Sequence, residues 1–199
     1  MTIKVIITTR PYQRIGVYMA KKDFIASFDL ETSNLYADFG VVLCGVVKPW
    51  GKAPVVFQQT DVSSDDSEVV KKLVAELDKY TILLAHNGVR FDRPFLNTRA
   101  TKYGMPILSP RSNIIDPVIV ARRHLRMGGN SLENLARYLG TKHQKSKVEG
   151  YLWQKATLDG DKDALAAIIK HCIIDVLVLE EVTEMLVPFI GRITEWGSA

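Results

Sequence analysis

The sequence predicts an α/β fold in which a mixed five-stranded sheet is flanked by helices. Three observations support this prediction. Apolar runs separated by tight turns come first, over residues 24–58; helical and strand patterns alternate over residues 65–116; and helical patterns alone continue to residue 187. Tight turns join antiparallel strands, whereas a helical crossover returns the chain parallel to an earlier strand, so we expect both kinds of pairing in the sheet.

The first three strands are expected to form an antiparallel meander. Residues 24–30 form a short buried strand, residues 40–48 a strand apolar enough to be central, and residues 55–58 a third strand. Pro49 and Gly51 favour a turn between the second and the third. This meander accounts for the antiparallel part of the sheet.

Two helix–strand units follow the meander. Asp65 or Asp66 can cap the first helix, and residues 81–85 form the next strand. Pro94 suits the first turn of a second helix, which leads to a fifth strand at residues 114–116. The C-terminal part is predicted to contain helices at residues 117–125, 131–139 and 163–186.

Length and composition describe one folded domain. The chain has 199 residues, 47% of them hydrophobic, and a net charge of +4, a mildly basic balance that permits nucleic-acid binding without requiring it. We expect an N-terminal extension or extra strand at residues 1–23, a domain at 24–190 and a tail at 191–199. Two cysteines are too few for a disulfide scaffold or a cysteine-only zinc site. Since no segment resembles a signal peptide or a membrane span, a cytoplasmic protein without membrane contact is expected.

Two carboxylates end the first predicted strand. Asp29 and Glu31 stand two residues apart, a spacing that puts both side chains on one face of a strand. Neighbouring carboxylates repel each other unless a cation neutralises them, and magnesium prefers oxygen ligands of this kind. A strand end that enters solvent also carries acidic residues, so the pair alone favours neither interpretation.

A polar segment follows the fourth strand. His86 and Asn87 leave the strand end, where the sites of α/β sheets collect, and Phe91 offers a ring on which a base can stack. Asp92 precedes the next helix, where it suits an N-cap nearly as well as a metal site, because both roles use the same oxygens. The neighbouring His86, Asn87 and Phe91 favour the site.

A third acidic position lies inside the long C-terminal helix. Asp175 stands among Ile173, Ile174 and Val176, where a buried carboxylate without a partner is costly. His171 lies one turn earlier on the same helical face. Either a simple His–Asp pair or a metal ligand beside a titratable base explains this arrangement.

Together the three segments resemble the DEDD superfamily of 3′–5′ exonucleases, DnaQ-like proteins that share an RNase H-like fold. The matching runs are Phe-Asp-Leu-Glu-Thr at 28–32, His-Asn-Gly-x-x-Phe-Asp at 86–92 and His-x-x-x-Asp at 171–175. The resemblance covers residues 24–187 and looks closest to a bacterial and phage group of RNase H-like exonuclease domains. It implies that Asp29, Glu31, Asp92 and Asp175 bind metal and that His171 is the general base.

The base departs from the family pattern. One branch of the superfamily has a tyrosine four residues before the last aspartate and the other a histidine five residues before it, whereas here His171 stands at the tyrosine spacing. Four residues is about one helical turn, so His171 can still face the site. Lys170, at the histidine spacing, is a poor base near neutral pH. His143 and Tyr151, in the preceding loop, are the reserve candidates.

The resemblance also implies a chemistry and a substrate. Two Mg²⁺ or Mn²⁺ ions about 4 Å apart would activate a water and stabilise the leaving 3′ oxygen, while His171 takes the proton. The substrate would be single-stranded nucleic acid with a free 3′ end, DNA before RNA. A proofreading role would need a polymerase or helicase partner. The residues expected to bind the terminal nucleotide are Thr32, Ser33, His86, Asn87 and Phe91.

Basic residues gather between the second and third segments, and Glu133 is the only acidic residue over residues 121–147. This part of the chain can follow a phosphate backbone, or it can be an ordinary solvated surface. Its basic residues are Arg111, Arg122, Arg123, Arg126, Arg137, Lys142, Lys145 and Lys147.

Three functions remain in competition. A 3′–5′ exonuclease leads, a metal-dependent endonuclease of ribonuclease H type comes second, and a non-catalytic nucleic-acid-binding module comes third. The complete carboxylate set argues against the third, because negative charge near phosphate weakens a pure binder. A substrate blocked at its 3′ end separates the first two.

Overall fold

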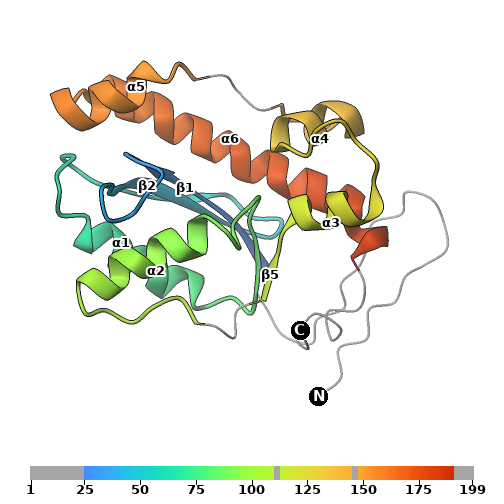
Figure 1. Ribbon diagram of the computed structural model, residues 1–199, viewed down its shortest axis with the longest axis horizontal. Helices are drawn as coiled ribbons and strands as arrows, with labels where there is room; N and C mark the ends of the chain where they lie inside the picture. The colour runs from blue at the N-terminus through green and yellow to red at the C-terminus, as the bar shows by residue number, and fades with distance from the viewer. Residues whose placement is uncertain (1–24, 110–112, 145–147, 191–199) are drawn as a thin grey trace.

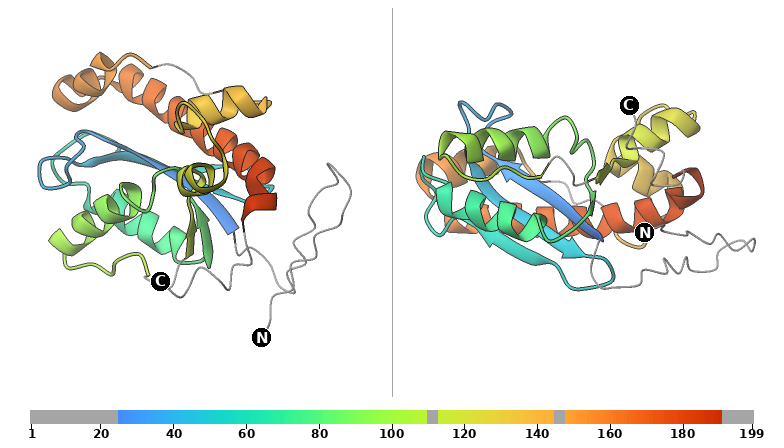
Figure 2. Two further views of the ribbon diagram at one scale, coloured as in Figure 1. Left: turned by 45° about the vertical axis from the view of Figure 1, so that its right-hand side comes forward. Right: turned by 90° about the horizontal axis from the view of Figure 1, so that it is seen from below.

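The chain folds into three layers, with a sheet between two layers of helices (Figures 1 and 2). This computed structural model describes residues 25–109, 113–144 and 148–190. The predicted extension at residues 1–23 and the predicted tail at 191–199 lie outside the described residues. The boundaries of the domain therefore stay predictions.

The sheet has five strands in the order β3-β2-β1-β4-β5. The central strand β1 (Ile25–Thr32) pairs antiparallel with β2 (Val42–Pro49), which pairs antiparallel with β3 (Val55–Gln58). On its other side β1 pairs parallel with β4 (Ile82–Leu84), and β4 pairs parallel with β5 (Asn113–Ile115). The predicted mixed five-stranded sheet, a meander followed by parallel strands, is confirmed.

Helices cover both faces of this sheet. α1 (Ser67–Leu77) and α2 (Asp92–Lys102) lie on one face, and the long α6 (Lys162–Leu186) crosses the other (Figure 1). α3 (Pro117–His124) and α4 (Leu132–Leu139) pack on α6, in a core cluster that they share with Ile82 and Leu84 of β4. Each of these helices was expected from the sequence to within a few residues. Gly140 ends α4 in the left-handed region at φ 72°, as expected of a C-terminal glycine.

Three short helical segments flank α6 and were not predicted. α5 (Tyr151–Gln154) runs into a stretch of π-helix, η1 (Lys155–Asp159), and a 3-10 turn, η2 (Val187–Phe189), follows α6. Tyr151, predicted to lie in a loop, begins α5. The four residues of α5 are too few to show a helical period, so no pattern could reveal it.

Alternation along β1 divides its side chains between the two helical layers. Ala26, Phe28 and Leu30 are buried in a cluster with α1 and α2. Asp29 and Glu31, which alternate with them, must therefore face the layer of α6. The strand thus places two carboxylates beneath the longest helix.

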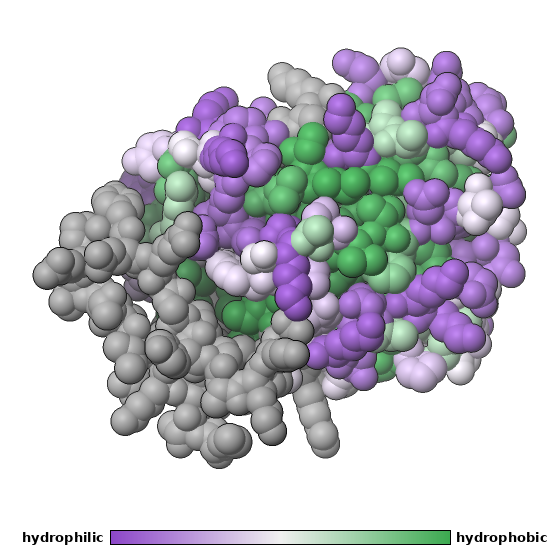
Figure 3. Space-filling view, turned by 180° about the vertical axis from the view of Figure 1, so that it is seen from behind, coloured by the Kyte–Doolittle hydropathy of each residue, from purple (hydrophilic) through white to green (hydrophobic). Residues whose placement is uncertain are grey.

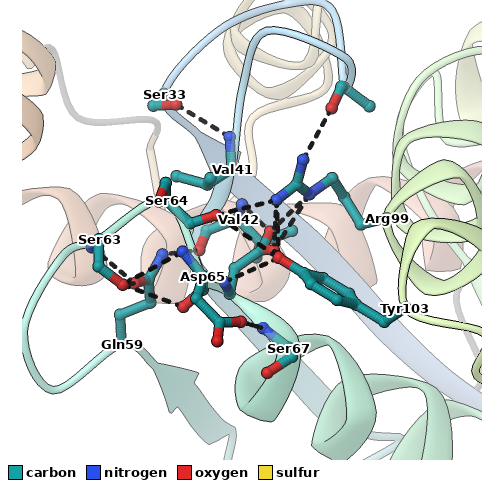
Figure 4. A network of polar contacts seen from close by, with 12 residues as sticks. Ser33, Val41, Val42, Gln59, Ser63, Ser64, Asp65, Ser67, Arg99 and Tyr103 are labelled. Carbon is teal, nitrogen blue, oxygen red and sulfur yellow. Dashed lines mark hydrogen bonds and ion pairs between the residues drawn. The ribbon is translucent and has the colours of Figure 1, made fainter.

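Asp66 occupies the N-cap position of α1, but its side chain makes no capping hydrogen bond, which corrects that part of the prediction. Asp65 instead accepts the Ser67 N–H at 3.0 Å. The Asp66 carboxylate accepts hydrogen bonds from Arg99 of α2, from Tyr103 just after that helix and from the Val42 N–H of β2, in the network of Figure 4. These partners lie far along the chain, so the sequence could not reveal them.

The surface seen from behind carries apolar side chains at its centre, ringed by polar ones (Figure 3). Apolar atoms make up more than half of an ordinary protein surface, so the patch alone indicates no partner. Within the described residues, no helix has the length and apolar character needed to cross a membrane.

Candidate active site

The first acidic pair lies near the C-terminal end of β1. Asp29 stands opposite Val46 and Glu31 opposite Cys44 in the pairing with β2, and the register shifts after Glu31. Both carboxylates are half-buried. The side-chain ligand atoms of Asp29, Glu31 and Cys172 lie within 4.8 Å of one another, a separation that allows one ion to contact all three.

α6 brings the third segment to this pair. His171 Nε2 lies 3.7 Å from Asp175 Oδ2, one helical turn away, and 3.9 Å from Glu31 Oε1 on β1. His171 is 7% exposed and Asp175 4% exposed. The structure therefore places the first and third segments around one imidazole.

The Asp92 side chain reaches β1 from the start of α2. Its Oδ1 accepts a hydrogen bond from the Leu30 N–H at 3.1 Å. Leu30 lies 62 positions earlier in the chain, between Asp29 and Glu31. Burial raises the pKa of the Asp92 carboxyl well above its usual range, and the negative charge of Asp29 raises it further. Asp92 makes no N-cap bond, because Phe91 holds the cap position. Its carboxyl instead ties the second segment to the first.

A tight turn after β4 positions this part of the site. Asn87 adopts φ 63° and its carbonyl accepts the N–H groups of Arg90 and Phe91, each at 3.0 Å. A Cβ on Gly88 would lie 2.2 Å from the Ala85 Cβ, so only glycine fits there. The turn thereby directs Phe91 and the start of α2 toward β1.

Asp116 holds this turn from the next strand. Its Oδ1 accepts the Asn87 N–H at 3.0 Å and the Val118 N–H at 3.0 Å, so it caps α3 as well. Burial raises the pKa of Asp116, while these hydrogen bonds oppose the rise. The sequence analysis did not single out Asp116, although the Asp-Pro step before α3 is a recognisable helix start.

A pocket of about 380 Å³ opens beside Glu31. Three of the five predicted nucleotide-binding residues line it: Thr32, Ser33 and Phe91. His86 and Asn87 are not among the lining residues in the described part of the chain. The remaining lining residues are Leu30, Asn34, Leu35 and Trp153.

Two further residues at the site, Trp153 and Cys172, were not predicted. Trp153 of α5 donates its indole N–H to Glu31 Oε2 at 3.2 Å. Cys172 Sγ donates to the Asp29 carbonyl at 3.4 Å. Burial raises the pKa of the Cys172 thiol well above its usual range, with further contributions from the Cys44 side chain and the Asp29 charge. Its place beside His171 in the sequence was the only available indication.

The reserve bases are occupied elsewhere. His143 Nδ1 lies 2.6 Å from Glu181 Oε1, and its backbone N–H donates to the same carboxylate at 3.0 Å. Tyr151 is 54% exposed, with the Lys155 ammonium 5.7 Å above its ring centre. His171 is therefore the imidazole that lies beside Glu31 and Asp175.

The described members of the predicted basic cluster lie on or near α3 and α4. Arg122, Arg123, Arg126 and Arg137 are all exposed, and so is Lys142. Arg111, Lys145 and Lys147 lie outside the described residues. The exposed positions agree equally with a phosphate-binding surface and with ordinary solvation.

The donor set suits hard divalent cations. Carboxylate oxygens of Asp29 and Glu31 reach a common point, and burial together with the charge of Asp29 raises the pKa of the nearby Asp92 carboxyl. A cation between such groups would offset that repulsion. The residues present therefore fit a magnesium or manganese centre, although the Cys172 thiol adds a softer donor.

Two comparisons with known proteins give likenesses to DNA polymerases. A stretch of 47 residues is 36% identical to a DNA polymerase of Methanocaldococcus jannaschii, and it covers 24% of this chain and 3% of that protein. The fold is similar to part of the family B DNA polymerase from the hyperthermophilic archaeon Pyrobaculum calidifontis. That likeness has a TM-score of 0.69 and 18% identity, over 84% of this chain and 25% of the polymerase.

The chain thus corresponds to a small part of each polymerase, and the second likeness is one of fold. The family model of the RNase_H superfamily matches residues 26–187, from the start of β1 to the end of α6. This range contains every strand of the sheet and all three acidic segments. The chain therefore belongs to the RNase H superfamily.

Proposed function

We propose that this chain is a metal-dependent 3′–5′ exonuclease that acts on single-stranded nucleic acid. Membership in the RNase H superfamily supports a nuclease in general. The finer proposal rests on one observation: segments from β1, the start of α2 and the middle of α6 converge at one end of the central strand. The likeness to two DNA polymerases favours DNA over RNA as the substrate.

In this proposal Asp29, Glu31, Asp92 and Asp175 hold the cations. When bound, two divalent ions would lower the pKa of the attacking water and stabilise the leaving oxygen. Asp92 contributes from a position fixed by the Leu30 N–H, and Asp175 from a buried place on α6. Four rigidly placed carboxylates give such a centre a defined geometry.

His171 serves as the general base. Its Nε2 lies within 4 Å of two of the proposed ligands, Glu31 and Asp175, so it can reach a water next to them. Histidine accepts a proton near neutral pH, and the two carboxylates stabilise the imidazolium that forms. Burial under Trp153 restricts the ring to a narrow range of orientations.

The pocket beside Glu31 receives the terminal nucleotide. Its volume of about 380 Å³ falls in the usual range of small-ligand sites. Phe91 and Trp153 supply aromatic surface for a base, and Thr32 and Ser33 supply polar groups for the sugar and phosphate. A pocket that ends beside the acidic cluster suits a chain end.

End-labelled oligonucleotides test this proposal. Linear single-stranded DNA and RNA carrying either a 3′ hydroxyl or a 3′ phosphate, and a circular single strand, are incubated with Mg²⁺, Mn²⁺ or EDTA. We expect stepwise shortening from a free 3′ hydroxyl with release of mononucleotides, severe slowing by the 3′ phosphate, and no activity in EDTA. Equal cleavage of the circle would instead establish an endonuclease.

A further inference from the structure

Trp153 contacts two of the proposed catalytic side chains at once. Its indole Nε1–H donates a hydrogen bond to Glu31 Oε2 at 3.2 Å. Its ring and the His171 imidazole form a T-shaped pair, with ring centres 6.2 Å apart and planes at 89°. Trp153 also lines the pocket. One side chain therefore links a proposed metal ligand, the proposed base and the pocket.

The two carboxylate oxygens of Glu31 have different neighbours. Oε2 accepts the indole N–H of Trp153, whereas Oε1 lies 3.9 Å from His171 Nε2. His171 Nε2 lies in turn 3.7 Å from Asp175 Oδ2. The indole hydrogen bond thus holds one oxygen of Glu31 so that the other is directed toward the side of Asp175.

Local structure fixes Trp153 in this place. It lies in α5, whose four residues continue into the five-residue π-helix η1. π-Helical turns are rare and frequently occur at functional sites. Ala156 of η1 is fully buried in a cluster with Ile168 of α6, and Trp153 packs against the same cluster. The indole is therefore held by core packing and not by a loose loop.

We propose that Trp153 is a positioning residue that orients Glu31 for cation binding. The inference rests on the proposed function, because it takes Glu31 as a metal ligand. Hydrogen-bond partners of metal ligands fix the direction of the ligand atoms, and their loss typically lowers metal affinity or activity 10–100-fold. A side chain without the N–H would remove this restraint on Oε2 and weaken the orientation of Oε1 toward Asp175.

Manganese binding tests the inference without relying on hydrolysis. Free Mn²⁺ is measured by electron paramagnetic resonance during titration of the wild type, Trp153→Phe and Trp50→Phe. Trp50 is the matched control, because its backbone N–H donates to the Ile25 carbonyl, which places this tryptophan at the opposite end of β1. We expect Trp153→Phe to weaken Mn²⁺ binding about 10–100-fold and Trp50→Phe to leave it unchanged.

The outcomes separate the two proposals. If Trp153→Phe binds Mn²⁺ as tightly as the wild type, Trp153 does not position Glu31, while the proposed function stands. If the wild type binds no Mn²⁺ and degrades no oligonucleotide, the proposed function fails as well.

A double-mutant cycle distinguishes positioning from a general loss of structure. Because Trp153 acts through Glu31, Trp153→Phe should have little further effect on Mn²⁺ affinity in a Glu31→Gln background. Melting temperatures in EDTA should be similar for the two tryptophan variants. Additive losses of affinity in the double variant, or a fall in melting temperature confined to Trp153→Phe, would overturn the inference.

Discussion

Two buried aspartates are accommodated in opposite ways by this fold. Asp66, 1% exposed, lies 2.7 Å from Arg99 Nη2 and 2.7 Å from the Tyr103 hydroxyl. Asp92 is 3% exposed. Burial contributes most to its raised pKa, and the charge of the Asp29 carboxylate contributes next. Asp66 lies beside a cationic side chain, that of Arg99, whereas Asp92 lies beside another anionic one, that of Asp29. Asp66 is therefore built for structure, whereas Asp92 belongs to a group suited to an external cation.

The Asp66 carboxylate is bound by side chains of the protein itself. Burial lowers the pKa of the Arg99 guanidinium, but the hydrogen bonds and charge of Asp66 together with those of Tyr103 outweigh this and raise the pKa. Burial and the Asp66 carboxylate both raise the pKa of Tyr103. Arg99 Nη1 also donates to the Ala37 carbonyl, in the loop between β1 and β2 (Figure 4). Because residues 33–35 of that loop line the pocket, this structural network also supports the pocket wall.

The strongest test of the comparison is Asp29→Asn. The change removes one charge from the acidic cluster while keeping its shape, so we expect hydrolysis to fall below detection in Mg²⁺ and Mn²⁺. Without metal, the melting temperature should stay the same or rise, because repulsion with Asp92 is relieved. Activity assays and melting curves in EDTA measure the two effects. Full hydrolysis by this variant would remove Asp29 from the metal centre.

His171→Ala is expected to have the next largest effect. General-base catalysis typically contributes a factor of about 100–10,000, so the rate should fall on that scale while Mn²⁺ affinity changes little. The acidic limb of the pH–rate profile should flatten, because the titrating base is gone. If the loss instead follows a fall in melting temperature, the His171–Asp175 contact is structural only.

Arg99→Met tests the structural half of the comparison. The Arg99 and Asp66 side chains are 3% and 0% exposed, so the variant leaves a buried carboxylate without its cation. Removing one partner of such a pair costs about 3–5 kcal/mol of unfolding free energy. Lys79→Met is the matched control, because Lys79 pairs with Glu76 and its side chain is 63% exposed. Such exposed ion pairs contribute about 1 kcal/mol or less to the unfolding free energy. Equal losses in urea unfolding would mean that burial does not distinguish the pairs.

The difference between local and distant contacts explains which features could be predicted from the sequence. The strands and longer helices were predictable, because burial imposes a period on residues close together in the chain. The three acidic segments were recognisable, since each keeps its chemistry within five to seven consecutive residues. Their convergence was implied by the family resemblance and not by spacing.

Contacts between distant residues were not predictable. Asp66 looked like a helix cap, because a cap needs only local sequence, whereas its partner Arg99 is 33 residues away. Trp153 gave no indication, because α5 is too short for a period and its hydrogen bond reaches Glu31, 122 residues earlier. The sequence was used to judge the two cysteines only as disulfide or zinc candidates, and only the fold brings the Cys172 thiol beside Asp29 and Glu31.

The smallest expected effect is a change in the pH dependence of stability in Asp92→Asn. Because the pKa of Asp92 is raised in the folded state, its protonated form stabilises the metal-free protein. This contribution is fully present below the ordinary aspartate pKa of 3.8 and is lost as pH rises through the pKa of the folded state. The unfolding free energy then falls by about 1.4 kcal/mol per pH unit at most. Asparagine can still accept the Leu30 N–H but cannot ionise, so its unfolding free energy in EDTA should lack this decline.

Asp65→Asn supplies a control of opposite sign for this measurement. Hydrogen bonds from Ser67 lower the pKa of Asp65, so its contribution is present above 3.8 and is lost as pH falls. The asparagine variant should therefore lose stability near neutral pH, where Asp92→Asn gains it. Urea unfolding in EDTA from pH 4 to pH 8 compares the two variants with the wild type. A wild-type slope retained in Asp92→Asn would show that Asp92 is ionised in the metal-free fold, and the contrast with Asp66 would then rest on geometry alone.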